Sequence, residues 1–178
     1  MPSELLKTFK TSGAVAFSSH RLVRRIIRNI NFKNAGCLIE LGPGNGRITK
    51  ELLRGMRSDA ILYAFEVNKA FCIELAKIAD PRLKVINKSA SDIKEFVSSI
   101  KFPAKNYIIS SIPFGILPET ECEQIMRAIY YASDKHTTLI QFSYSLIQYR
   151  RFKKYFSKVK VQFEPINIPP AFVFVCKK

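Results

Sequence analysis

Short apolar runs alternate along this chain with longer segments in which apolar side chains recur every three or four residues. The short runs are typical of buried parallel strands, and the longer segments are typical of amphipathic helices. The pattern predicts strands at 37–41, 60–67, 83–87, 106–111 and 137–144. It predicts helices over 20–30, 47–56, 68–78, 118–131 and 146–158, with a further helix ending near Ile100. Two final strand-like runs, 159–164 and 171–178, predict a terminal hairpin, so the expected fold is a doubly wound, mainly parallel α/β sheet.

The first strand, Cys37 to Leu41, leads into a turn with glycine at alternate positions, Gly42, Gly44 and Gly46. Glycine permits positive φ and close approach of a ligand, and the helix that follows offers unpaired N–H groups. The spacing differs from the dinucleotide fingerprint, and the preceding Glu40 would repel a pyrophosphate but suit an ammonium or sulfonium group. We therefore expect a nucleoside-type ligand here, the alternative being an ordinary strand-to-helix turn without a ligand.

Glu66 stands at the tip of the second predicted strand, about twenty residues beyond the glycines. Nucleotide-binding α/β units hold ribose hydroxyls with an acid at this place. We expect Glu66 to bind a ribose, because a plain surface glutamate is not typical after a buried apolar run.

The chain has 178 residues and a net charge of +15. The length favours one domain, and the charge favours a polyanionic partner, either nucleic acid or the anionic face of a membrane, unless the basic surface is functionally idle. No apolar run is long enough to cross a bilayer and Met1 to Lys10 lacks the features of a signal peptide, so we expect a cytoplasmic protein. The four cysteines are far apart and favour reduced structural thiols; no metal site is expected.

Two predicted helices carry much of the positive charge. The helix over 20–30 has one apolar stripe and one basic stripe, and it either packs on the core with its basic side in water or touches a membrane or RNA. The helix over 146–158 mixes basic and aromatic side chains, which suits phospholipid head groups or stacked nucleic acid, although about half of the aromatics can be core. The basic residues expected at the partner surface are Arg21, Arg24, Arg25, Arg28, Arg150, Arg151, Lys153 and Lys154.

The segment Glu40 to Gly46 resembles the first motif of class I S-adenosylmethionine-dependent methyltransferases. The resemblance implies a Rossmann-like, seven-stranded fold with S-adenosylmethionine as the cofactor. Methyltransferases of this class commonly place an acid just after the third strand to accept from the adenine amino group, whereas Ser89 stands at that place and Asp92 is expected to cap the next helix. The cofactor-binding residues implied are Ser18, Glu40, Gly42, Gly44, Gly46, Glu66, Val67, Ser89 and Ala90.

Two families within that class share features with the chain. Leu38 to Thr49 and Ser111 to Phe114 look like the ribosomal RNA adenine dimethylases, whose fourth-strand motif is Asn-(Leu/Ile)-Pro-(Tyr/Phe). In those enzymes the asparagine accepts from the target adenine and the aromatic ring stacks on it. Here Phe114 is available to stack, but Ser111 replaces the asparagine. We expect no counterpart of that family's C-terminal helical domain.

The bacterial phospholipid N-methyltransferases resemble the chain nearly end to end. Gly13-Ala14-Val15 with Ser18-Ser19 is similar to that family's Gly-Ala-Val-x-Pro-Ser-Ser, with Phe17 in place of proline. Ser110 to Pro113 resembles its Ser-Gly-Leu-Pro, with serine for glycine. The more specific matches are Gln141 to Ser145, similar to Gln-Phe-Thr-Tyr-(Ser/Gly), and Asn167 to Ala171, similar to Asn-x-Pro-Pro-Ala.

These resemblances favour methylation of a lipid amine such as phosphatidylethanolamine, with ribosomal RNA adenine as the alternative acceptor and a non-catalytic binding module as a third possibility. Tyr144, Ser110, Ser111 and Phe114 are the residues expected at the acceptor, although Tyr144 also fits a half-buried strand aromatic. We expect a basic amphipathic segment at 1–33 packed on a methyltransferase domain at 34–178, and a monomer acting in the cytoplasm or at the inner membrane face.

Overall fold

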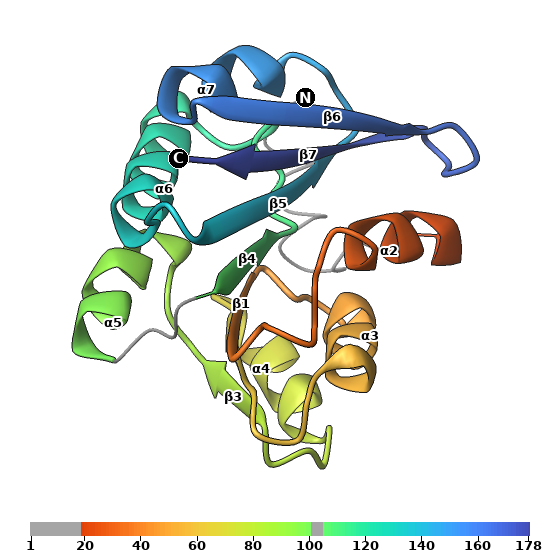
Figure 1. Cartoon of the computed structure of the whole chain (residues 1–178), viewed down its shortest axis with the longest axis vertical. Coiled ribbons are helices and arrows are strands. Elements are labelled where there is room, and N and C mark those ends of the chain that lie inside the picture. Colours follow the sequence, from red (N-terminus) through yellow and green to blue (C-terminus); the bar gives the residue numbers. More distant parts are fainter. Residues whose placement is uncertain (1–18, 101–104) are drawn as a thin grey trace.

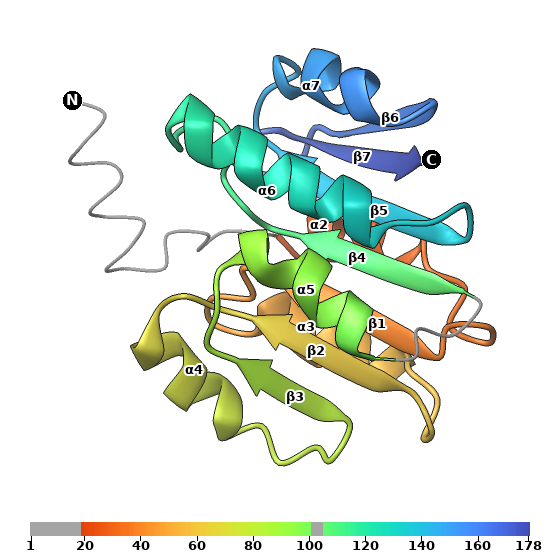
Figure 2. The ribbon, with the colours of Figure 1, turned by 90° about the vertical axis from the view of Figure 1, so that its left-hand side faces the viewer.

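The computed structural model describes residues 19–100 and 105–178, and it shows one seven-stranded sheet with helices on both faces (Figures 1 and 2). The strands are β1 (Cys37–Leu41), β2 (Ile61–Phe65), β3 (Leu83–Ile86), β4 (Asn106–Ser110), β5 (Thr137–Ser143), β6 (Lys158–Glu164) and β7 (Ala171–Lys177). The helices are α2 (His20–Ile27), α3 (Arg47–Gly55), α4 (Lys69–Ala76), the 3-10 turn η1 (Ala90–Asp92), α5 (Ile93–Ser99), α6 (Glu119–Ala132) and α7 (Gln148–Tyr155).

The strand order is β3-β2-β1-β4-β5-β7-β6. The first five strands pair in parallel, and β7 pairs antiparallel with both β5 and β6. The order reverses between β1 and β4, and open α/β sheets bind ligands outside the carboxyl ends of the strands at such a point. The predicted fold class, a mainly parallel seven-stranded sheet with a terminal antiparallel hairpin, is confirmed.

Two apolar layers cover the sheet, one on each face. The layer that contains Ile39 and Leu41 of β1 is completed by side chains of α5, α6 and α7. The layer that contains Leu38 is completed by side chains of α2 and α3. Because successive residues of a strand face opposite sides, Glu40 lies on the same side as Leu38, toward α3.

Helix α2 packs on the sheet and is tied to β6 by an ion pair. At its start the Ser19 hydroxyl accepts from the Leu22 backbone N–H at 3.2 Å, which satisfies one of the free donors of the first turn. Leu22, Val23 and Ile26 are buried, and Arg25 Nε donates to Glu164 of β6 at 2.9 Å. The apolar stripe of α2 therefore packs on the core. The proposed boundary between residues 33 and 34 stays a prediction.

Candidate functional site

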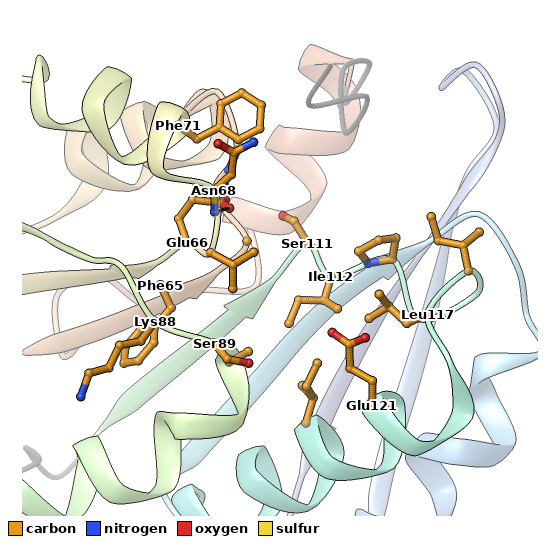
Figure 3. A pocket seen from close by; sticks show the side chains of 17 residues that line it. Phe65, Glu66, Asn68, Phe71, Lys88, Ser89, Ser111, Ile112, Leu117 and Glu121 are labelled. Atoms are coloured by element: carbon orange, nitrogen blue, oxygen red, sulfur yellow. Dashed lines mark hydrogen bonds between the residues drawn. The ribbon is translucent and has the colours of Figure 1, made fainter. Parts of the chain in front are cut away.

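A cavity of about 460 Å³ opens at the carboxyl ends of the parallel strands, where the strand order reverses between β1 and β4 (Figure 3). Its walls come from the turns after β1, β2, β3 and β4 and from the first turns of α4 and α6. The lining residues are Gly42, Gly44, Phe65, Glu66, Val67, Asn68, Phe71, Lys88, Ser89, Ala90, Ser111, Ile112, Pro113, Ile116, Leu117, Glu121 and Ile125.

The glycine turn forms one wall of this cavity. Gly42, Gly44 and Gly46 all have positive φ, of 70°, 55° and 76°, a region that strongly favours glycine. A Cβ placed on Gly44 would meet no atom within 4 Å, so the backbone there borders open space. A Cβ on Gly46 would lie 2.9 Å from the Leu75 side chain, so Gly46 instead allows α4 to pack against the start of α3.

Glu66 joins the turn after β2 to the glycine turn. Its Oε2 accepts from the Gly44 backbone N–H at 3.1 Å, and its Oε1 accepts from the Asn68 N–H at 2.8 Å. Only 6% of the residue is exposed, yet it lines the cavity. An ionised carboxylate has about four acceptor positions, so after these two bonds it can still accept from vicinal hydroxyls of a ligand.

Glu40 lies beneath the cavity and not in its wall. The strand alternation turns it toward α3, where its Oε2 accepts from the Thr49 hydroxyl at 2.7 Å. The residue is fully buried, and this burial raises the pKa of its carboxyl to about 8. Glu40 is not among the residues that line the cavity, and its bond to Thr49 ties β1 to α3. Direct contact between Glu40 and a cationic ligand stays a prediction.

The turn after β3 supplies Ser89 and Ala90 to the cavity, together with Lys88. The Ser89 hydroxyl accepts from the Ser91 N–H at 3.2 Å and from the Ser91 hydroxyl at 2.8 Å, so it caps the 3-10 turn. Val67 also lines the cavity. Ser18 lies outside the described residues.

Ser111 lines the cavity at the end of β4, whereas the neighbouring Ser110 is fully buried. The side chain of Gln141 crosses from β5, and its Nε2 donates to the Ile112 carbonyl at 3.0 Å and to the Phe142 carbonyl at 2.6 Å. Gln141 therefore fixes the turn that presents Ser111 and Ile112 to the cavity.

Besides Ser110, two aromatic residues expected at the acceptor do not line the cavity. Phe114 is 4% exposed and packs edge-on to Phe152 of α7, with ring centroids 6.2 Å apart. Tyr144 is half-buried and its ring packs edge-on to Phe142. Burial raises the pKa of its hydroxyl, and a hydrogen bond with Asn167 lowers that pKa by less. The strand-end geometry brings Ser111 to the cavity and leaves these two aromatics in the packing beside it.

Asn167 explains one of the specific sequence matches. It is fully buried; its Oδ1 accepts from the Ser19 N–H at 2.8 Å, and its Nδ2 donates to the Pro169 carbonyl at 2.7 Å. The residue ties the turn between β6 and β7 to the start of α2, so the match at 167–171 marks a structural tie in this chain.

Three of the basic residues expected at a partner surface have acidic partners within the chain. Arg25 pairs with Glu164, Arg151 pairs with Glu119, and Lys154 pairs with Glu123 at 3.0 Å. These three side chains also hold helices to their neighbours, and the expectation that all eight basic residues face a partner stays a prediction. The other five are Arg21, Arg24, Arg28, Arg150 and Lys153, none of which has an ion pair in the part of the chain described.

Glu121, which was not among the predicted site residues, lines the cavity from α6. Glu121 and Ile125 are four residues apart and share one side of α6, and Leu117, just before the helix, lines the cavity beside them. An acid between two apolar residues on the inward side of a helix was the signal available in the sequence.

Sequence comparison relates the chain to known methyltransferases. No family model matches the chain. It is 27% identical over 177 residues to the ornithine lipid N-methyltransferase of Singulisphaera acidiphila, covering 96% of this chain and 92% of that protein. It is 26% identical over 107 residues to ribosomal RNA small subunit methyltransferase A of Thermotoga neapolitana, covering 60% of this chain and 38% of that protein.

Solved structures share the fold at low identity. The 1,6-didemethyltoxoflavin-N1-methyltransferase of Burkholderia thailandensis, solved with S-adenosylhomocysteine, superposes with a TM-score of 0.69 at 10% identity, covering 99% of this chain and 86% of that one. The N-methyltransferase NodS of Bradyrhizobium japonicum, also solved with S-adenosylhomocysteine, gives a TM-score of 0.68 at 10% identity, covering 89% and 86%. The fold is that of class I S-adenosylmethionine-dependent methyltransferases.

The cavity suits this cofactor on its own geometry. Gly44 leaves room for a ligand against the backbone, Glu66 can accept from ribose hydroxyls, and Ala90, Ile112 and Ile125 give apolar walls for a base. The predicted enzyme class and cofactor are confirmed. The role of each residue in the cavity remains a proposal.

Proposed function

We propose that this S-adenosylmethionine-dependent methyltransferase methylates the amine of a membrane lipid, such as an ornithine lipid or phosphatidylethanolamine. The observation that carries the proposal is the length of the match to the ornithine lipid enzyme, which spans 96% of this chain and 92% of that relative. The ribosomal RNA relative matches 60% of the chain and only 38% of its own length.

Exposed apolar residues at the same end of the sheet as the cavity support a lipid acceptor. Four apolar residues, Leu146, Ile147, Ile166 and Ile168, form what we call the apolar rim, and Ile147 and Ile168 are 80% and 86% exposed. Leu146 and Ile147 follow β5, and Ile166 and Ile168 lie in the turn between β6 and β7.

The strand register places the apolar rim on the cavity side of the sheet. Phe172, just after the β6–β7 turn, pairs with Ser143 at the carboxyl end of β5. Both loops therefore project from the same edge of the sheet as the cavity. Exposed apolar tips beside basic side chains are typical of proteins that rest on an anionic bilayer.

Arg150 and Lys153 of α7 supply positive charge next to the rim, and both are exposed. Each basic side chain near an anionic membrane contributes about 1 kcal/mol of attraction. No described helix is long and apolar enough to cross a bilayer. We propose that the protein acts in the cytoplasm and rests peripherally on the inner membrane face.

The chemistry asks for alignment and for removal of a proton. The cofactor supplies a methyl group on a sulfonium, and transfer is an in-line displacement by a neutral amine. A lipid amine is mostly protonated near neutral pH and must lose a proton on entering a partly dry site. We assign to Ser111, and to the backbone carbonyls around it, the role of accepting from the amine and orienting it.

Tyr144 does not suit the role of a base. Burial raises the pKa of its hydroxyl, so the hydroxyl stays protonated near neutral pH. In our proposal Tyr144 shapes the acceptor side of the site and can donate or accept a hydrogen bond without changing its charge.

Methylation of a ribosomal RNA adenine is the second candidate. The turn Ser111 to Phe114 resembles the motif of the adenine dimethylases, and several relatives are named ribosomal RNA small subunit methyltransferase A. Against it, Phe114 packs in the core and Ser111 stands where those enzymes have asparagine.

A vesicle assay tests the proposal. Purified protein with methyl-labelled S-adenosylmethionine is incubated with vesicles of ornithine lipid or phosphatidylethanolamine, with or without anionic lipid, and label is counted in the lipid extract. We expect labelled lipid, and more of it with anionic lipid present. Absence of label from both aminolipids would contradict the proposal.

The apolar rim gives a sharper variant of this assay. Ile147→Ser with Ile168→Ser should weaken vesicle binding roughly tenfold, because two exposed side chains lose their apolar contact with the bilayer. Ile73→Ser on α4, 62% exposed and outside the rim, serves as the matched control. Equal vesicle affinity of the rim variant and the control would argue against docking by this edge.

A further inference from the structure

Glu121 is a carboxylate on the cavity wall. Figure 3 shows its side chain pointing from α6 into the cavity, toward Ile112. Within the described residues it makes neither a hydrogen bond nor an ion pair. The chain carries a net charge of +15, so an acid without a basic partner at this place is notable.

The acids on either side of Glu121 are used differently. Glu119 pairs with Arg151, and Glu123 pairs with Lys154 and accepts from the Tyr155 hydroxyl. Both bind α6 to α7, on the side of the helix away from the cavity. Glu121 is thus the acid of this helix that remains available to a ligand.

The cavity near Glu121 has apolar lining residues that suit a base. The ribose end is fixed by Glu66 and the glycine turn, and beyond it Phe65, Ala90, Ile112 and Ile125 offer apolar walls. η1, which carries Ala90, contacts α6 directly. A flat base between these walls would lie close to the inward side of α6.

Adenine in such a slot needs an acceptor for its exocyclic amino group, which donates hydrogen bonds. The turn after β3 offers Ser89 there, but its hydroxyl is already bonded twice to Ser91. A side-chain carboxylate from α6 would supply the acceptor that this turn lacks.

We propose that Glu121 accepts a hydrogen bond from the amino group of the cofactor's adenine and so selects adenine over bases without that group. The proposal concerns cofactor recognition, and it holds whether the methyl acceptor is a lipid or an RNA.

Calorimetry with two ligands tests it. The ligands are S-adenosylhomocysteine and its analogue in which unsubstituted purine replaces adenine, so that only the amino group is missing. Glu121→Ala should bind S-adenosylhomocysteine about tenfold more weakly than the wild type, as expected for a hydrogen bond to a charged group, and should bind the purine analogue nearly as well as the wild type.

Two further variants make the result specific. Glu121→Gln keeps an acceptor oxygen and should recover part of the affinity for S-adenosylhomocysteine. Glu119→Ala removes an acid from the same helix outside the cavity and should bind both ligands like the wild type. Circular dichroism verifies that each variant is folded, as expected for exposed side chains.

Equal affinity of wild type and Glu121→Ala for S-adenosylhomocysteine would overturn the proposal, as would an equal loss for both ligands. If the only defect of Glu121→Ala is a raised KM for an aminolipid in vesicles, Glu121 contacts the acceptor amine and the adenine assignment is wrong.

Discussion

Replacement of Gly44 and of Gly46 by alanine separates cofactor contact from packing. Both residues have positive φ, so both variants carry the same kind of backbone strain. They differ in what the new methyl group meets: open cavity at Gly44, and the Leu75 side chain at 2.9 Å and the Ile78 side chain at 3.3 Å at Gly46.

The magnitudes follow from these surroundings. A left-handed conformation costs alanine about 1–2 kcal/mol, offset by about 0.4–1 kcal/mol because alanine restricts the unfolded chain. Gly44→Ala should therefore lose roughly 1 kcal/mol of unfolding free energy. Gly46→Ala adds overpacking against α4, about 1–3 kcal/mol, and should lose roughly 3 kcal/mol in total.

Cofactor binding should show a different ranking of the two variants. The methyl group of Gly44→Ala enters the space beside the backbone N–H that Glu66 holds, so affinity for S-adenosylhomocysteine should fall about tenfold or more. Gly46→Ala, measured where it is folded, should keep most of its affinity.

Denaturant unfolding and calorimetry on the same preparations measure both quantities. If Gly44→Ala binds S-adenosylhomocysteine like the wild type, the cofactor does not approach the glycine turn and the assignment of this wall is wrong. If the two variants are equally destabilised, the packing role of Gly46 is wrong.

Three further predictions concern buried charges and thiols. The unfolding free energy of the wild type should fall by about 3 kcal/mol between about pH 5 and pH 7. The reason is that Glu40 stays protonated in the folded state up to its pKa of about 8, whereas in the unfolded state it ionises. Denaturant unfolding at each pH should show no such fall for Glu40→Gln. Arg25→Ala should lower the unfolding free energy by roughly 2 kcal/mol, because it leaves Glu164 buried without its partner. Since Arg25 helps hold the pKa of Glu164 below its usual range, the difference in unfolding free energy from the wild type should shrink at acidic pH. A difference that stays constant with pH would speak against the ion pair. Burial raises the pKa of the Cys37 thiol to about 12, so Cys37 should resist alkylation at mildly alkaline pH. The half-buried Cys72 should react first. Mass spectrometry of the alkylated native protein checks this order.

The sequence predicted the sheet well because each strand and helix has a strong local pattern. The apolar run before Gly42 and the acid at Glu66 fixed the two strand ends that border the cavity, and the structure brings them into contact through the Gly44 N–H. Local pattern and tertiary arrangement agree there.

The side of the sheet on which a side chain lies was harder to predict. Glu40 falls on the α3 side because of strand alternation, and Phe114 turns into the core against α7, an element far along the chain. Such contacts depend on packing between segments that are distant in the sequence, and a local sequence pattern does not predict that packing.

Pairing of charges was missed for the same reason. The basic stripe of α2 is visible in the sequence, but the partner of Arg25 is Glu164, 139 residues away. Glu121 was overlooked because an acid near a helix start is common, and only the cavity distinguishes it from Glu119.

The claim that the acceptor is a membrane lipid is tested most directly by a competition in one reaction. Purified protein and methyl-labelled S-adenosylmethionine are mixed with ornithine lipid vesicles and ribosomal subunits together, and label is counted in the separated lipid and RNA. We predict label in the lipid, at a level that falls when Ile147 and Ile168 are replaced by serine. Label in the RNA alone would contradict the account.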